Sequence, residues 1–278
     1  MSLRLTHDTL IAFDTSTERM AVAVQCGGQR FTEDAPGGAA ASAALLPTLQ
    51  ALLARAGRGM DQVAAIAFGR GPGAFTGLRT SCAVAQGLAL ALARPVLPID
   101  SLLIVAEQAR RQAALRVDFE IGVAIDARMG EIYAARYRWQ AGAQAKAGAA
   151  IDADADADVD ADVDADGRWS VGEAAALWEP RALAERWGQA PPDRCTGSAL
   201  ALFDAELQAC CPRALRLEAG TARAAALLAL AACAQRDGAG LDASHALPLY
   251  LRDKVALTTA ERAQAAAVAA AAASAAAR

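Results

Sequence analysis

The chain has 278 residues, a formal net charge of −4 and 55% hydrophobic residues, which suits one or two globular domains with a sizeable core. No run of about 20 apolar residues could span a membrane, and the N-terminus lacks the apolar core of a signal peptide. We therefore expect a cytoplasmic protein with no membrane role. The weakly acidic balance and scattered arginines do not favour direct nucleic-acid binding, so any role with RNA would come through a partner.

The first elements in chain order predict a sheet with an antiparallel edge. Apolar residues 10–13 indicate a buried strand that ends in the polar turn Asp14–Thr17. Residues 20–25 indicate a second strand, and Gly27-Gly28 a hairpin turn into a third at 30–33.

Five leucines then recur at helical spacing and predict one apolar helical stripe. They are Leu45, Leu46, Leu49, Leu52 and Leu53. Gly57 and Gly59 follow the stripe, and we expect them to end the helix.

The glycine-rich segment Gly69–Arg79 (GRGPGAFTGLR) is the most informative feature of the chain. It follows an apolar run at 63–68 that predicts a strand, and it opens a helix that we expect Thr76 to cap. Such a turn brings backbone close to a ligand or to another backbone. The segment is neither a Walker loop nor a dinucleotide fingerprint, because its glycine spacing fits neither pattern. The turn residues of interest are Gly71, Pro72, Gly73 and Arg79.

The helix after this turn carries small residues at four-residue spacing, and we expect it to run to about residue 93. A row of small side chains lets another helix approach closely, either inside the molecule or from a partner. The sequence alone does not decide which side of the helix faces out. The candidate partner-facing residues of this helix are Gly77, Leu78, Ser81, Ala85 and Ala89, beside the five leucines of the preceding helix.

The remaining elements are less regular. We expect strands at 96–99, 121–125 and 132–137, a helix capped by Ser101 that runs to about 112, and helices near 180–187 and 222–236. The segment 151–167 alternates Asp with Ala or Val. Asp and Ala are poor strand formers and the charges repel, so we expect disorder. The domains predicted are 1–112, then 113–255 with the disordered insert 152–166, then a flexible Ala-rich tail at 256–278.

Histidine and cysteine limit the chemistry. His7 and His245 are the only histidines, so no paired-histidine metal motif is possible, and a lone His is usually structural. The six cysteines form no C-x-x-C pair, and we interpret them as buried small hydrophobes.

Two carboxylates follow strand ends. Asp14, with Thr15 and Ser16 behind it, ends the first strand, and Asp126 ends a later one. A carboxylate in this place can hold a magnesium–phosphate, and the hydroxyls and amides after it can cradle the phosphate. Two such turns facing one another would make a nucleotide cleft. Equally, both could be Asx turns that satisfy local backbone.

In combination, five motifs resemble the TsaB (YeaZ) family, bacterial subunits of the machinery that makes N6-threonylcarbamoyladenosine at position 37 of tRNAs. The matching segments are Ile11–Thr17 (IAFDTST), Phe68–Arg79 (FGRGPGAFTGLR), Gln86–Leu90 (QGLAL), Ala124–Tyr133 (AIDARMGEIY) and Pro248–Arg252 (PLYLR). The resemblance implies an α/β fold like that of the actin–hexokinase–heat-shock ATPase superfamily, with two subdomains of which the second is degenerate.

The resemblance also implies a non-catalytic assembly subunit. The family relative that does the chemistry, TsaD, carries a metal-binding H-x-x-x-H after the strand equivalent to 96–99. Here that region, Asp100–Val105, has no such pair. We therefore expect no metal and no cofactor bound by this subunit alone, with ATP used by the complex, and a vestigial phosphate cleft at Asp14, Thr15, Ser16 and Asp126.

The partners implied are a TsaD-like transferase, bound through the helices of the first subdomain, and a TsaE-like ATPase. The same helices would form a homodimer, and tRNA would be reached only through the complex. One departure from the family pattern is Gly37–Ala44, where many relatives carry a polar segment, often with a histidine. The alternatives are a stand-alone Mg-ATP-using enzyme of the same fold and a peptidase, which has little physical support without a metal-ligand pair.

Overall fold

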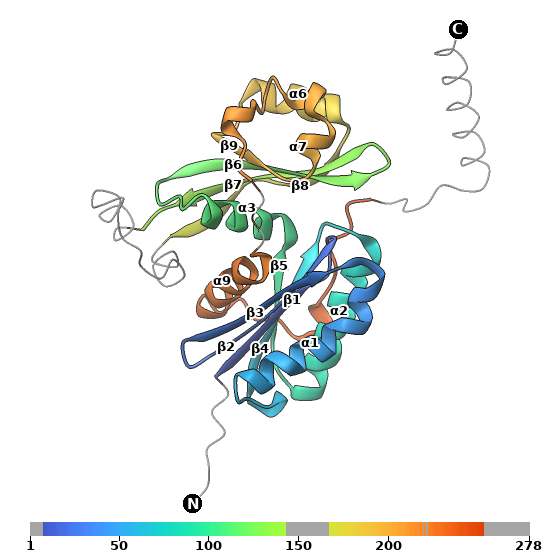
Figure 1. The fold of residues 1–278 in the computed structure, drawn as a ribbon, viewed down its shortest axis with the longest axis vertical. Coiled ribbons are helices and arrows are strands. Elements are labelled where there is room, and N and C mark those ends of the chain that lie inside the picture. The colour runs from blue at the N-terminus through green and yellow to red at the C-terminus, as the bar shows by residue number, and fades with distance from the viewer. Residues whose placement is uncertain (1–7, 143–166, 219, 221, 253–278) are drawn as a thin grey trace, which may run out of the picture.

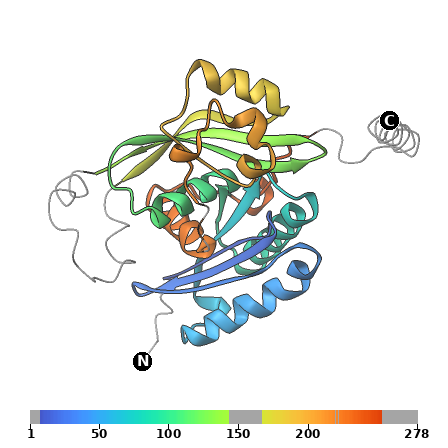
Figure 2. The ribbon, with the colours of Figure 1, turned by 45° about the horizontal axis from the view of Figure 1, so that its top comes forward.

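The computed structural model describes residues 8–142, 167–218, 220 and 222–252. The predicted Asp-rich insert 152–166 and the tail 256–278 lie outside these ranges. Figures 1 and 2 show two sheets, each with its own helices, stacked about a shared helical layer. The predicted α/β class is confirmed.

The first sheet has the strand order β3-β2-β1-β4-β5. Its strands are β1 (Thr9–Asp14), β2 (Arg19–Cys26), β3 (Gln29–Pro36), β4 (Val63–Gly71) and β5 (Val96–Asp100). β1 pairs antiparallel with β2 and parallel with β4, and β2 pairs antiparallel with β3. The hairpin and the antiparallel edge predicted from the sequence are therefore present.

Helices cover both faces of this sheet. On one face lie α1 (Ala41–Arg55) and α2 (Phe75–Leu92), whose buried side chains form one core with alternate residues of β1, β2 and β4. On the other lies α9 (Arg223–Arg236), which packs on the opposite residues of the same strands. The period-two alternation of each strand supplies both cores. Two short 3-10 helices, η1 (Gly38–Ala40) and η2 (Met60–Gln62), flank α1.

The second sheet has the order β8-β7-β6-β9. Its strands are β6 (Phe119–Arg128), β7 (Glu131–Gln140), β8 (Arg168–Trp178) and β9 (Arg194–Thr196). Helix α3 (Ser101–Gln112) packs on one face, while α6 (Pro180–Gln189), α7 (Ala199–Leu202) and α8 (Asp204–Leu207) cover the other. Two further 3-10 helices are η3 (Arg213–Leu215) and η4 (Ala243–His245).

Strands β8 and β9 are absent from the sequence prediction. β8 contains three consecutive alanines, Ala174–Ala176, which interrupt any apolar–polar alternation, and β9 has only three residues. Neither carries a period-two signal, so their pairing with β7 and β6 defines them.

The chain returns to the first sheet after completing the second. Helix α9, which the sequence places in the 113–255 subdomain, buries Ala224, Leu227 and Leu228 against the small residues of β1 and β2. Residues 246–252 then run back along α2, and Arg252 reaches the β6–β7 turn, where it donates to the carbonyl oxygen of Ala127 at 3.1 Å. Both returns depend on contacts between residues that are far apart in the chain. The order of the residues does not reveal such contacts.

The two predicted helix caps are wrong. The N-cap of α2 is Ala74, with no side-chain hydrogen bond, and not Thr76. The N-cap of α3 is Asp100, whose carboxylate accepts from the backbone N–H groups of Leu102 and Leu103, and not Ser101. A carboxylate is a strong N-cap acceptor, and Tyr137 holds it in place through a hydroxyl bond of 2.9 Å. Burial raises the pKa of Asp100, although these hydrogen bonds oppose that shift.

Candidate functional site

The glycines of the 69–79 segment bring backbone against backbone. A Cβ at Gly69 would lie 2.3 Å from Cγ of Asp14, one at Gly73 would lie 2.4 Å from the carbonyl oxygen of Ser16, and one at Gly77 would lie 1.8 Å from that of Thr15. Real Cβ atoms do not approach other atoms so closely, so the β4–α2 turn can rest on the β1–β2 turn only because these positions lack side chains.

The other turn residues are also engaged inside the protein. Gly71 has a φ of +105° and donates its N–H to Ser101 Oγ at 3.0 Å, and the Gly71–Pro72 peptide bond is cis. Arg79 is exposed, stacks its guanidinium 3.8 Å from the centre of the Phe75 ring and donates from Nε to the Tyr250 hydroxyl at 3.2 Å.

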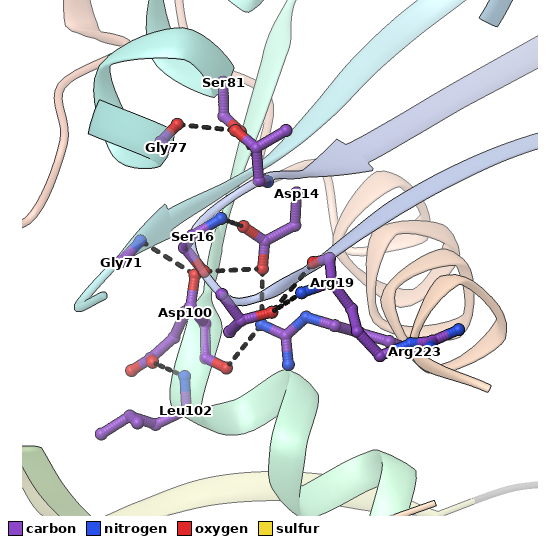
Figure 3. A network of polar contacts seen from close by, with 12 residues as sticks. Asp14, Ser16, Arg19, Gly71, Gly77, Ser81, Asp100, Leu102 and Arg223 are labelled. Atoms are coloured by element: carbon purple, nitrogen blue, oxygen red, sulfur yellow. Dashed lines mark hydrogen bonds and ion pairs between the residues drawn. The ribbon is translucent and has the colours of Figure 1, made fainter. Parts of the chain in front are cut away.

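The Asp14 turn is held by hydrogen bonds and an ion pair within the chain (Figure 3). Asp14 is fully buried, and its carboxylate accepts from Ser16 N–H at 2.7 Å, from Ser16 Oγ at 3.0 Å and from Arg223 Nη2 at 2.5 Å. Thr15 donates its N–H to Ser81 Oγ at 3.0 Å and its hydroxyl to the Gly77 carbonyl oxygen at 2.7 Å. All three candidate phosphate-cleft residues of this turn are therefore buried and bonded to their own chain.

The Asp126 turn is open by comparison. Asp126 is half-buried, its N–H donates to Ser198 Oγ at 3.0 Å, and its carboxylate accepts from the N–H of Arg128 at 2.7 Å. This is the geometry of an Asx turn. Gly130 completes the turn with a φ of +76°.

The two turns face a common cavity of about 640 Å³ between the subdomains. Ser16, Thr17, Asp126, Arg128, Ser198 and Arg223 line part of it. Glu18 and Arg128 meet across its rim at 2.6 Å, with both side chains mostly exposed. The expected arrangement of two facing turns is present, but Asp14 is not among the residues that line the cavity.

Most of the predicted partner-facing residues are core. Leu45, Leu49, Leu52, Leu53, Leu78, Ser81, Ala85 and Ala89 are each at most 3% exposed. Gly77 is half-buried against the Asp14 turn, and Leu46 alone of the set is exposed, at 40%. The stripe points inward because the first sheet needs an apolar cover, and the row on α2 is small because the helix lies close to β1. These buried residues cannot meet a partner while the chain keeps this fold.

The outward faces of α1 and α2 carry exposed apolar residues among polar ones. Leu90 is 80% exposed, and Ala83 and Gly87 precede it on the same exposed stripe of α2. On α1, Leu46 is followed by the exposed Pro47. Large apolar side chains exposed on these helices are candidate contacts for a partner.

Arg223 is the residue of the site that the sequence analysis missed. It is the first residue of α9, where a positive charge opposes the helix dipole. That local mismatch is the one sequence signal that could have drawn attention to it.

Within the described residues, no group of three or more His, Cys, Asp or Glu side chains is placed to hold a metal ion. None of the helices described there is long and apolar enough to cross a membrane. The six cysteines are free thiols, of which Cys233 is half-buried and the other five are buried, as expected.

Comparisons with known proteins agree with the family resemblance found in the sequence. Residues 37–165 match the family model TsaD, tRNA N6-adenosine threonylcarbamoyltransferase. The chain is similar to the tRNA threonylcarbamoyladenosine biosynthesis protein TsaB of Escherichia coli, with 30% identity over 89% of this chain and 96% of that protein. It is also 42% identical to the TsaB of Haemophilus influenzae. That match covers 45% of this chain and about half (52%) of the H. influenzae protein.

Among solved structures, YeaZ from Pseudomonas aeruginosa superimposes with a TM-score of 0.64 and 32% identity, covering 88% of this chain and all of that one. The two-sheet α/β architecture implied by the resemblance is confirmed. On the near-complete match to its E. coli and P. aeruginosa relatives, the chain belongs to the TsaB (YeaZ) family.

Proposed function

We propose that this chain is a non-catalytic assembly subunit in the synthesis of N6-threonylcarbamoyladenosine on tRNA, and that it binds and supports a TsaD-like transferase. The names of its E. coli and H. influenzae relatives support the biosynthetic role. The protein would act in the cytoplasm and would reach tRNA only through the complex.

The observation that carries the proposal is the exposure of large apolar side chains on the outer side of the α1–α2 layer. The inner faces of these helices are covered by the first sheet, yet Leu90 and Leu46 remain exposed on the outside. Burying apolar surface of this kind contributes about 25 cal/mol per Å². The same face would serve a homodimer, which would then compete with the transferase for it.

The Asp14 turn supports a non-catalytic role for this subunit beside a catalytic transferase. Its carboxylate already has a guanidinium partner within the chain, so the subunit gains no charge balance from a metal-bound nucleotide there. We propose that it binds no cofactor alone, that the complex uses ATP, and that a TsaE-like ATPase joins the assembly. The two facing turns are what a stand-alone Mg-ATP enzyme would need, but the Asp14 carboxylate is already paired with Arg223, and within the described residues we find no feature that favours a peptidase.

The test is association with a purified TsaD-like transferase, followed by light scattering. The wild-type chain forms a heterocomplex, and Leu90→Arg abolishes it while the variant stays folded. Leu202→Arg is the matched control, because Leu202 is also exposed, at 60%, but lies on α7 of the second subdomain. Two species that stay separate at micromolar concentrations would contradict the proposal.

The buried row of small residues on α2 provides a second variant for this test. Ala85→Arg unfolds the chain instead of only blocking association, because Ala85 is fully buried in the core and an unpaired charge there costs several kcal/mol. Circular dichroism separates the two variants: Leu90→Arg keeps the native spectrum and Ala85→Arg does not. A folded Ala85→Arg monomer would show that the row is not core.

A further inference from the structure

The Asp14 turn allows a direct test of whether a metal–nucleotide fits this chain, since a carboxylate at a strand end is a place where a divalent cation binds. Both oxygens of Asp14 have partners. Oδ1 accepts from the N–H of Ser16, while Oδ2 accepts from its hydroxyl and from Nη2 of Arg223. A cation could reach Oδ2 only by displacing the guanidinium. The residues as arranged do not fit a metal ion.

On the side of β4 the packing leaves no room for an added ligand, and on the side of the cavity Ser16 and Arg223 lie between the carboxylate and the open space. Gly69 on β4 lies so close that even a methyl group there would overlap Asp14. The side chains of Arg223 and Asp14 are 4% and 0% exposed. Arg223 also donates to the Ser101 carbonyl oxygen at 3.3 Å, which joins α9 to the start of α3.

The position of Arg223 has no local explanation. The N-cap of α9 is Ala222, which offers no side-chain acceptor, and an arginine in the first turn opposes the helix dipole. A second carboxylate of the first sheet, Asp34 on β3, accepts from the N–H of Ala224 at 3.2 Å. Burial raises the pKa of Asp34, while this bond and the arginines at 19 and 223 act against the rise. Two acidic side chains of the sheet thus hold the start of α9.

We infer that Arg223 is the built-in counter-ion of Asp14: its guanidinium takes the place that a divalent cation would need, and it anchors α9 on the first sheet. Arg223 is a positioning residue in this role. The inference rests on the proposed function and deepens it, because it gives a physical reason why this subunit would leave nucleotide chemistry to its partner.

The first experiment uses the wild-type chain. Its thermal midpoint is measured in EDTA, in millimolar Mg²⁺ or Mn²⁺, and in either cation with ATP. We expect no shift, since the charge of Asp14 is already neutralised. A rise in the midpoint with cation that Asp14→Asn abolishes would overturn the inference.

The second experiment is a double-mutant cycle of Asp14→Asn and Arg223→Met. Each single change leaves one buried polar partner uncompensated and lowers the midpoint by about 6–20 °C. The double variant removes both charges, so its loss is clearly smaller than the sum of the two. Strictly additive losses would overturn the inference. Arg223→Lys, which keeps the charge without the planar fork, falls between the wild type and Arg223→Met.

These results separate this inference from the proposed function. If the wild-type chain does not bind the TsaD-like transferase, the proposed function fails, and a coupled cycle still supports Arg223 as counter-ion. If the chain binds the transferase but Asp14 also binds the cation, the inference alone fails.

Discussion

The Asp14 and Asp126 turns look alike in sequence and differ in three dimensions. Each aspartate follows an apolar strand and precedes a polar turn. Asp14 is fully buried and ion-paired to a residue 209 positions away, whereas Asp126 is half-buried and bonds mainly to its own turn. Whether a strand-end carboxylate can receive a ligand depends on what packs over it.

The packing differs because the first turn is covered by glycines and the second is not. Gly69, Gly73 and Gly77 let β4 and α2 close over residues 14–16. A side chain at Gly130 would meet nothing within 4 Å, so the second turn stays on the rim of the inter-subdomain cavity. Glycine-rich segments are also common in loops that bind phosphate. Here the glycine-rich segment packs over the Asp14 turn of the same chain.

The largest effect expected comes from Gly77→Ala. Its Cβ would overlap the Thr15 carbonyl oxygen, so the backbone of the Asp14 turn must move, and we expect a loss of roughly 3 kcal/mol or more in the free energy of unfolding. Gly130→Ala costs only about 1 kcal/mol, through its positive φ. Urea denaturation measures both.

Gly87→Ala is the control in the same helix. Nothing lies within 4 Å of a Cβ at this position, so the change stabilises α2 by up to about 1 kcal/mol. Equal losses for Gly77→Ala and Gly130→Ala would remove the distinction between the two turns.

An effect of similar size separates the aspartates themselves. Asp14→Asn leaves Arg223 charged and buried without its partner, and we expect a loss of about 3–5 kcal/mol. Asp126→Asn keeps the side-chain oxygen of the Asx turn and costs less than about 1 kcal/mol. Chemical denaturation of the two variants under identical conditions measures both losses in the free energy of unfolding. Their ratio would be near one if the two turns were equivalent.

The smallest effect concerns the pair that bridges the rim of the cavity. Glu18 and Arg128 are 85% and 70% exposed, so water and salt screen their attraction. We expect Glu18→Gln to change the free energy of unfolding by no more than about 0.5 kcal/mol. A larger loss, disappearing at high salt, would show that the pair holds the subdomains together.

Much of the architecture could be predicted from local patterns. The strands β1 to β3, the leucine helix and the strand–turn–helix at 63–92 follow from periodicity and glycine, because each of these patterns lies within one continuous stretch of the sequence. Strands β8 and β9 and the cap at Asp100 could not be recognised in this way, since partners elsewhere in the chain define them.

The candidate site divides in the same way. The sequence by itself determined the two aspartate turns, the glycine segment and the motifs that identify the family. Only the tertiary structure decided that the small-residue row of α2 faces the sheet, leaving Leu90 outside, and that Arg223 neutralises Asp14. A helix with apolar residues on two sides does not encode which side meets the core, and a contact between residues 14 and 223 has no local signature. Both are set by how distant segments pack.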